Sequence, residues 1–362
     1  MTLTDRWRTG RVCIVMMSAV GDTVHALPIV TALKRHAPGC HITWVLQPGP
    51  ASLVRGHPAV DEIVLFERAK GWRAYVDARR KLARPFDLVL ALQVYLKAGL
   101  VTALTRAPVK LGFDRARARD LNWLVTTHRI PPHAPQHVQD QYFEFLDVLG
   151  VPHEPPTWDL GPWPVEREAQ RRFFAPIGRP VVTLAIGTSA PQREWPPERW
   201  AELSDALVER HGLQPVLAGA GSPRERETER VILERSRHAP LSTLGSPLRE
   251  LVWLLEGSAL VVALDSAPLH LAVALGRPVI ALMGCNDPGR VGPYRRFHDL
   301  LVDAYGEPGV DAPVSSAHRR DRMPRIQVAD VVARVETWKL RYADPQRVSA
   351  ARAITSPTSS TP

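Results

Sequence analysis

The sequence has few cysteines and lacks the common metal-binding and targeting signatures. Its three cysteines, Cys13, Cys40 and Cys285, are far apart and form no C-x-x-C pair, which argues against a disulfide framework and a structural zinc site. HExxH, DxD and clustered His and carboxylate spacings are missing, so no residue is assigned to a metal. The apolar stretch at 12–17 is too short to cross a bilayer and no cleavage signature follows it. We therefore expect a reducing compartment, the cytoplasm.

Positive charge exceeds negative charge over the whole chain. There are 46 Lys and Arg residues against 37 Asp and Glu, a formal net charge of +9, which predicts an anionic ligand. No RNP-type or zinc-finger pattern occurs, and aromatic residues do not alternate with the basic runs, so nucleic acid is not expected as a partner. A small phosphorylated ligand fits better. The length of 362 residues favours two domains over one.

Apolar runs alternate with amphipathic segments through the first 150 residues. Strands are predicted at residues 11–17, 41–47, 61–66, 86–92 and 109–113. Helices are predicted at 22–37 and at 137–150, where Gly150 provides a stop signal, with further helical patterns between the other strands. This alternation predicts an α/β fold in which residues 1–150 form a doubly wound, Rossmann-like domain.

A segment rich in Pro and Trp at 151–164, "VPHEPPTWDLGPWP", interrupts the pattern and is interpreted as a linker. A second Rossmann-like domain is expected at 165–326, followed by a helix at 327–342 that could pack back on the first domain and by a disordered tail at 343–362. Its strands are predicted at 179–187, 213–219, 240–244, 259–264 and 277–284, and its helices at 197–211, 224–237, 247–257 and 268–275. Two such domains in tandem commonly bind a ligand in a central cleft.

Polar residues follow several of these strands. Asp22 comes after the first strand and is interpreted either as a helix cap or as a general base that accepts a proton from a bound hydroxyl. Thr188, Ser189 and Arg193 follow the strand at 179–187 and are suitable donors to phosphate oxygens, unless they belong to an ordinary polar loop.

The stretch "LDSAPLHLAVALG" at 264–276 combines a strand end with a helix start. Asp265 and Ser266 precede Pro268, and the first free N–H groups of the helix favour an anion, although a simple capping role for Asp265 is the alternative. His270 could be a ligand contact or a hydrogen-bonded core histidine. In "LAGAGSPRERE", Arg224 occupies the third glycine position of a GxGxxG pattern, so Glu225 is either a ribose contact or a solvated helix residue.

Long motifs in the chain resemble glycosyltransferase family 9, the bacterial heptosyltransferases of lipopolysaccharide core synthesis. "SAVGDTVHALPIVTALKR" resembles the family's opening "SSxGDxxHxLPxxxxL", and "RGHPAVDEIV" and "VKLGFDRARAR" resemble intermediate blocks. "DSAPLHLAVALGRPVIALMGCNDPGRVGPY" resembles "DTGPxHLAxALGxPVxALFGPTDPxxxGPY". The chain departs from the family pattern at Met16, Arg193, Ser266–Ala267 and Cys285–Asn286.

The resemblance implies a GT-B fold and an inverting, metal-independent transfer of heptose from ADP-heptose to a phosphorylated, lipid-linked inner-core acceptor of the Kdo–lipid A type. It makes Asp22 the catalytic base and places the nucleotide sugar, with no other cofactor, on the second domain. The donor contacts it implies are Thr188, Ser189, Arg193, Glu225, Asp265, Ser266, Ala267 and His270. The acceptor contacts it implies are Ser18, Gly21 and His25 of the opening motif.

Basic residues at 114–120 are expected to meet acceptor phosphates, unless they form only a charged surface helix. These residues are Arg115, Arg117 and Arg119. Peripheral contact with the cytoplasmic face of the inner membrane is expected through basic surface and the acceptor lipid. Three other functions stay open: transfer from another nucleotide sugar, epimerisation of a nucleotide sugar, and sugar-nucleotide binding without catalysis.

Overall fold

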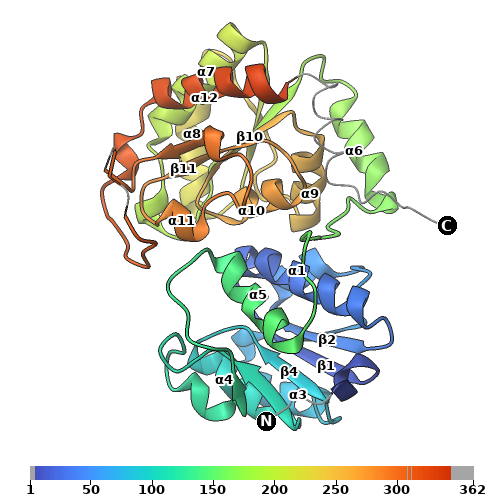
Figure 1. Cartoon of the computed structure of the whole chain (residues 1–362). Helices are drawn as coiled ribbons and strands as arrows, with labels where there is room; N and C mark the ends of the chain where they lie inside the picture. Colours follow the sequence, from blue (N-terminus) through green and yellow to red (C-terminus); the bar gives the residue numbers. More distant parts are fainter. Residues whose placement is uncertain (1–4, 308, 311, 344–362) are drawn as a thin grey trace, which may run out of the picture. The chain divides into compact units, whose positions relative to one another are not determined.

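The computed structural model describes residues 5–307, 309–310 and 312–343, and the chain divides into two compact units (Figure 1). The first unit is Met1–Leu160 and the second begins at Gly161. This boundary falls inside the Pro-rich segment that was interpreted as a linker. Among the described residues, no helix combines the length and the apolar character that crossing a membrane requires.

The first unit is a six-stranded parallel sheet with helices on both faces. Its strands are β1 (Arg11–Val15), β2 (His41–Leu46), β3 (Glu62–Leu65), β4 (Leu88–Ala91), β5 (Val109–Gly112) and β6 (His128–Arg129). Its helices are α1 (Val20–His36), α2 (Pro48–Val54), α3 (Trp72–Lys81), α4 (Leu96–Leu104) and α5 (Val138–Leu149), with short turns of 3₁₀ helix at η1 (Asp5–Arg8), η2 (Arg68–Lys70) and η3 (Asn122–Val125). The strand order is β3-β2-β1-β4-β5-β6.

The second unit repeats this topology. Its strands are β7 (Val181–Ala185), β8 (Gln214–Ala218), β9 (Leu241–Ser242), β10 (Leu260–Leu264), β11 (Val279–Met283) and β12 (Leu301–Asp303), in the order β9-β8-β7-β10-β11-β12. Its helices are α6 (Arg167–Phe174), α7 (Pro197–His211), α8 (Pro223–Arg235), α9 (Leu248–Gly257), α10 (Ala267–Ala274), α11 (Pro288–Val291) and α12 (Val328–Tyr342), and its 3₁₀ turns are η4 (Pro164–Glu166), η5 (Pro191–Arg193), η6 (His298–Leu300) and η7 (Met323–Arg325). Both units therefore have the 3-2-1-4-5-6 strand order of doubly wound folds.

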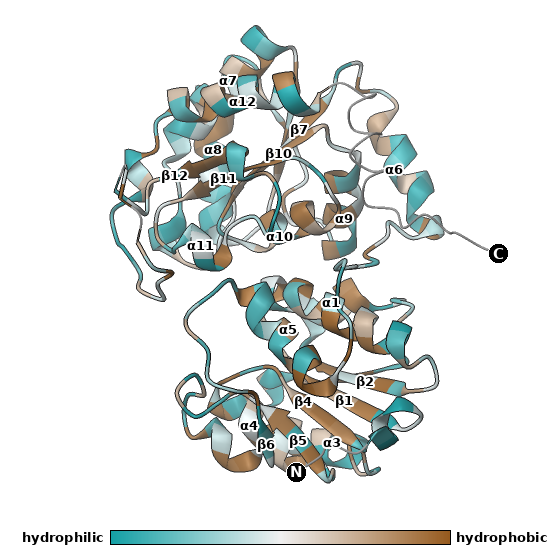
Figure 2. Ribbon diagram, in the orientation of Figure 1, coloured by the Kyte–Doolittle hydropathy of each residue, from teal (hydrophilic) through white to brown (hydrophobic). Residues whose placement is uncertain are grey.

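The central strands form because their residues are apolar on both faces. All five residues of β10 are buried, as are all five of β7 and β11, which is the pattern of a parallel sheet covered on both sides by helices. Figure 2 shows these strands mainly in brown. In the second unit the rings of Trp195 and Trp200 pack edge to face on each other, with centroids 5.0 Å apart, and both belong to the apolar cluster of this sheet.

Helix α12 belongs to the core of the second unit. Its buried residues Val328, Val331, Val335 and Trp338 join the same apolar cluster as the strands of that sheet, and the helix packs on α7 and β12. The sequence suggested that this helix could return to the first domain. The buried residues recur at i, i+3 and i+7, so they share one face of the helix, and that face packs within the second unit. The tail from residue 344 onward lies outside the described residues.

Candidate active site

Asp22 lies in the first turn of α1, just beyond the carboxyl end of β1. The helix is capped by Ala19, whose backbone N–H donates to Asp22 Oδ2 at 2.9 Å. Asp22 is thus the third helical residue and reaches back to the cap, rather than being the N-cap itself as the sequence suggested. A carboxylate in this position stabilises the start of a helix, and it also stands at the sheet edge where doubly wound folds bind ligands.

Gln93 joins the ends of the two central strands of the first sheet. Its side chain accepts a hydrogen bond from the backbone of Met17 at 3.2 Å and donates to the carbonyl oxygen of Ser18 at 2.6 Å. β1 and β4 are neighbours at the point where the strand order reverses, which is the usual ligand position in this topology. Sequence reasoning missed Gln93, because a lone amide after a strand carries no signal until the strand order is known.

The other residues of the opening motif follow Asp22 along α1. Gly21 lies in the first turn, and His25 is buried one turn later with its Nδ1 3.2 Å from Gln139 Oε1 of α5. Gln139 Nε2 also donates to the carbonyl oxygen of His25 at 2.8 Å. His25 therefore connects α1 to α5 and fixes the start of α1 in place.

The three arginines at 115–119 have different environments. Arg117 is largely buried, pairs with Asp114 and makes a bidentate bridge to Glu144 with both Nη–O distances at 2.7 Å. This differs from the expectation that it meets acceptor phosphates, because its guanidinium is already committed to two carboxylates. Arg115 and Arg119 are exposed, on a loop and not on the surface helix considered as the alternative.

In the second unit, Arg193 and Asp265 meet where the strand order reverses between β7 and β10, the switch point that corresponds to the one between β1 and β4 in the first unit. Arg193 follows β7 and Asp265 follows β10, and these strands are neighbours with Ala185 opposite Ala263. Arg193 Nη1 lies 3.5 Å from Asp265 Oδ2. The structure therefore brings together two residues that are separated by 72 positions and were assigned independently to donor binding.

Asp265 is held by side chains and does not cap the helix that follows it. Asn286, at the end of β11, donates from Nδ2 to Asp265 Oδ2, and its Oδ1 contacts His318 Nδ1. Burial raises the pKa of the Asp265 carboxyl, and Arg193 and Asn286 offset only part of this effect. His318 was missed because the polar segment around it gave no periodic signal.

The segment that follows β7 contains two buried polar atoms without partners. Within the part of the chain that the structure describes, Thr188 Oγ1 and Arg193 Nε have no hydrogen-bond partner although both atoms are buried. Ser189, next in the chain, is exposed. A buried donor or acceptor left unsatisfied costs about 1–3 kcal/mol, so these atoms are suited to contact a ligand.

The start of α10 completes a donor cluster, whose other two parts are the Arg193–Asp265 pair and the segment after β7. Ser266 is the N-cap residue, but its hydroxyl donates to the carbonyl oxygen of Leu264 at 3.3 Å and makes no capping bond. Ala267 is half-buried at the first helical position, and His270 is buried one turn later. A helix start without a side-chain cap presents N–H groups and a positive dipole end to an anion.

Glu225 is buried and not solvated, which corrects one of the two interpretations from sequence. Its carboxylate accepts from the backbone N–H groups of Ser222 at 2.7 Å and Ala220 at 3.2 Å, closing a capping box at the start of α8. It also packs against the end of β7, where a Cβ added to Gly187 would overlap its Oε1. Glu225 therefore bridges the ends of β7 and β8.

Two other departures from the family pattern are buried. Met16 is 1% exposed, and its carbonyl oxygen accepts a hydrogen bond from Trp44 Nε1 at 3.1 Å. Cys285 is buried at the end of β11, and burial raises the pKa of its thiol. Among the described residues, no group of three or more His, Cys, Asp or Glu side chains is arranged to hold a metal ion.

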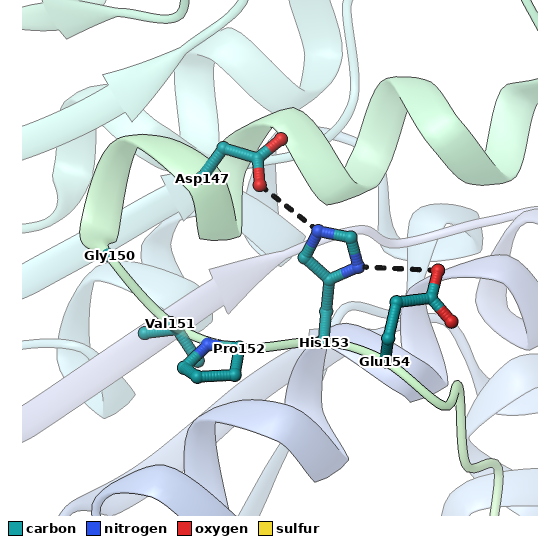
Figure 3. Close-up of a pocket in the computed structure, with 6 residues that line it drawn as sticks. All are labelled: Asp147, Gly150, Val151, Pro152, His153 and Glu154. Atoms are coloured by element: carbon teal, nitrogen blue, oxygen red, sulfur yellow. Dashed lines mark hydrogen bonds and ion pairs between the residues drawn. The ribbon is translucent and has the colours of Figure 1, made fainter.

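A depression of about 460 Å³ lies elsewhere, at the end of α5 (Figure 3). His153 points between Asp147 and Glu154, with Nε2 3.0 Å from Asp147 Oδ1, and its ring stacks on Phe143 at 4.4 Å. These contacts hold the chain against α5 as it leaves the helix. None of the predicted site residues lines this depression.

Comparison with known proteins gives one consistent result. The sequence profile of glycosyltransferase family 9 (heptosyltransferase) matches residues 76–308. The chain is 26% identical over 335 residues to the lipopolysaccharide core heptosyltransferase OpsX of Haemophilus influenzae, covering 90% of this chain and 95% of the relative. It is 31% identical to lipopolysaccharide heptosyltransferase 1 of Escherichia coli K12, covering 78% and 91%.

A solved structure shares the fold over almost its whole length. The E. coli heptosyltransferase WaaC with ADP superposes with a TM-score of 0.70 at 26% identity, covering 92% of this chain and 99% of that one. This agreement confirms the expected GT-B architecture of two Rossmann-like units. The profile match, the relatives and the fold together show that the chain belongs to glycosyltransferase family 9, the heptosyltransferases, and is a glycosyltransferase enzyme.

Proposed function

We propose that this enzyme transfers heptose from ADP-heptose to a lipopolysaccharide inner-core acceptor of the Kdo–lipid A type, with inversion at the anomeric carbon and without a metal ion. The relatives named for lipopolysaccharide heptose transfer support the substrate class, and the structure solved with ADP supports the nucleotide. The observation that carries the proposal is the cluster of Arg193, Asp265 and the uncapped start of α10 at the switch point of the second sheet.

The donor diphosphate fits this cluster by charge and by hydrogen bonding. Negative charge develops on the leaving phosphate as its bond to the sugar breaks, and preorganised donors stabilise it. Arg193 Nε, Thr188 Oγ1 and the first N–H groups of α10 supply such donors, with Ser189, Ser266 and Ala267 alongside. Asp265 orients the guanidinium of Arg193 through their 3.5 Å contact.

The nucleoside is assigned to the neighbouring strand ends. Glu225 keeps acceptor capacity beyond the two backbone N–H groups that it binds, because an ionised carboxylate has about four lone-pair positions. We assign it to the ribose hydroxyls. His270 is buried in α10, and we assign it to supporting the start of this helix where the diphosphate binds.

Asp22 is assigned as the base in the first unit. It would accept the proton of the acceptor hydroxyl as the oxygen attacks the anomeric carbon, while the carbon–oxygen bond to the diphosphate breaks on the opposite face and the configuration inverts. Ser18, Gly21 and His25 surround or position this turn, and the exposed Arg115 and Arg119 are retained for acceptor phosphates. Arg117 is omitted because Asp114 and Glu144 bind it.

The test is to incubate the full chain with ADP-heptose and Kdo–lipid A and to measure ADP release and the mass of the lipid product. We expect ADP release only when both substrates are present. Release with UDP- or GDP-sugars instead would refute the heptose donor, and donor turnover without acceptor would indicate an epimerase. ADP at 100 times its Kd should stabilise the folded enzyme by about 2.7 kcal/mol, which a thermal shift measures, whereas UDP and GDP should not.

A further inference from the structure

Helix α4 of the first unit is apolar on its outer face as well as its inner face. Ala98 and Val101 face the core, but Leu96 and Leu100, one turn apart, are about half exposed, and Lys97 is the only charged residue of the helix. The helix is drawn largely in white and brown (Figure 2). A surface helix of a globular domain ordinarily has a polar outer face, so the apolar outer face of α4 is a candidate interaction surface.

The segment at 119–125 extends this apolar surface. Asn122 Nδ2 donates to the carbonyl oxygens of Gln93 and Tyr95 at 3.1 and 3.0 Å, and η3 packs directly on Gly99 of α4. We call the resulting surface the α4 patch. Its members are Tyr95, Leu96, Leu100, Leu121 and Leu124, which are 49%, 50%, 44%, 62% and 60% exposed.

The concentration of exposed apolar side chains here is unusual for this chain. Across the described residues, twelve large hydrophobic side chains are exposed, and five of them form the α4 patch. Two more, Trp72 and Val76, lie one turn apart on α3, which packs beside α4. Single exposed apolar residues need no explanation, but several exposed apolar side chains on elements that pack on each other, as α4 and η3 do, indicate an interaction surface.

Basic and aromatic side chains surround the α4 patch. Arg115 lies over the Trp123 ring at 4.5 Å, Arg129 lies over the same ring at 5.6 Å, and Arg119 lies over the Tyr95 ring at 5.9 Å. These three arginines are exposed, as is Lys97. Leucine side chains edged by Trp, Tyr, Lys and Arg are the composition of a protein surface that lies in a membrane interface.

The charge favours lipid over a second copy of the chain. Lys97, Arg115, Arg119 and Arg129 outnumber the exposed Asp120 beside them, so two copies meeting face to face would bring like charges together. An anionic bilayer supplies both the negative surface and the apolar depth that this surface requires. Helix α4 is about 14 Å long, which suits a helix lying in the plane of the interface.

We propose that the α4 patch docks the first unit on an anionic lipid bilayer, with Leu96, Leu100, Leu121 and Leu124 entering the interface and the basic residues binding lipid phosphates. This surface shares Arg115 and Arg119 with the acceptor contacts of the proposed function, but it goes beyond the transfer reaction, because neither the donor cluster nor Asp22 contributes to it. The lipid need carry no saccharide acceptor.

Vesicle co-sedimentation of the full chain tests the proposal. The vesicles contain phosphatidylcholine with about 30% phosphatidylglycerol, or phosphatidylcholine alone. We expect binding to the anionic vesicles that weakens steeply with salt. The triple variant Leu96→Gln/Leu100→Gln/Leu124→Gln should bind about tenfold or more weakly, and Lys97→Gln should weaken binding about fivefold. The matched control Val165→Gln/Leu233→Gln/Leu241→Gln, exposed residues of the second unit, should bind like wild type.

A fluorescence experiment covers the case in which the triple variant does not fold. Cys13, Cys40 and Cys285 are buried, so an environment-sensitive maleimide dye will label Leu124→Cys selectively. Its emission should shift to the blue on anionic vesicles, and that of Leu233→Cys should not. Equal binding by the triple variant and its control, equal binding to neutral and anionic vesicles, or a wild-type dimer that the triple variant dissociates would each overturn the proposal. Because these vesicles contain no acceptor, loss of transferase activity leaves this result unaffected.

Discussion

Replacing Asp22 by Asn separates its assigned role as a base from its visible role at the helix start. The Asn side chain has the same size, and its carbonyl oxygen can still accept the hydrogen bond from the Ala19 N–H, now 2.9 Å long. It cannot take a proton from the acceptor. We therefore expect stability within about 0.5 kcal/mol of wild type and a fall in kcat of about 10²–10⁴, equal to about 3–5 kcal/mol in the activation free energy.

Asp22→Ala removes both functions. Loss of the bond to Ala19 at the start of the 17-residue helix α1 should cost about 1 kcal/mol, or about 2–4 °C in Tm for a unit of this size. The chain contains a matched control, because Asp330 Oδ2 accepts from the Gln327 N–H at 2.8 Å at the same position of α12. Asp330→Ala should lose similar stability and keep its full kcat.

The assay measures ADP release at saturating donor and acceptor, with ADP affinity measured separately by calorimetry. Both Asp22 variants should bind ADP like wild type, because Asp22 belongs to the first unit and the proposed donor site to the second. If Asp22→Asn retains kcat within about twofold, far less than loss of a general base produces, Asp22 is only a helix cap and the assignment fails. If Asp330→Ala also loses kcat, the effect of Asp22→Ala is structural.

Three further predictions follow from the second unit. Gly187→Ala should destabilise the fold by about 2–4 kcal/mol in urea unfolding, because its Cβ would displace the buried Glu225 carboxylate. The control Gly178→Ala, at a position with open space around it, should change stability by less than about 0.5 kcal/mol. Equal effects of the two variants would refute the packing argument. Arg193→Lys should keep the fold but weaken ADP binding about tenfold or more in calorimetry, because an ammonium cannot make a bidentate contact; unchanged affinity would exclude Arg193 from the donor site. Burial lowers the pKa of the His211 imidazole, so on acidification the unfolded state gains a proton that the folded state does not. The free energy of unfolding should therefore fall as the pH is lowered from about 7.5 to 5.5. His211→Gln should reduce this pH dependence, and an unchanged pH profile in that variant would contradict the argument.

The alternation of strands and helices was predictable because burial on both faces requires continuous apolar runs. The runs at 259–264 and 277–284 correspond to β10 and β11. The helix at 197–211 was placed to the residue, and the helix predicted at 327–342 begins one residue later, at Val328. The short strands β6 and β12 and helix α6 were missed. β6 and β12 are edge strands of two and three residues, and α6 has only Gln170 buried, so none of them leaves a long apolar pattern.

Local sequence thus determined which residues form strands and helices, and it placed Asp22, Arg193 and Asp265 at strand ends, because apolar periodicity and turn residues act over a few neighbouring positions. Only the tertiary structure decided which partners those residues meet. Strand order brings Asn286 to Asp265 and Glu225 under Gly187. The packing of helix α5 pairs Arg117 with Glu144, 27 positions away. These contacts depend on how distant segments pack, and a side chain's own sequence neighbours do not encode that packing.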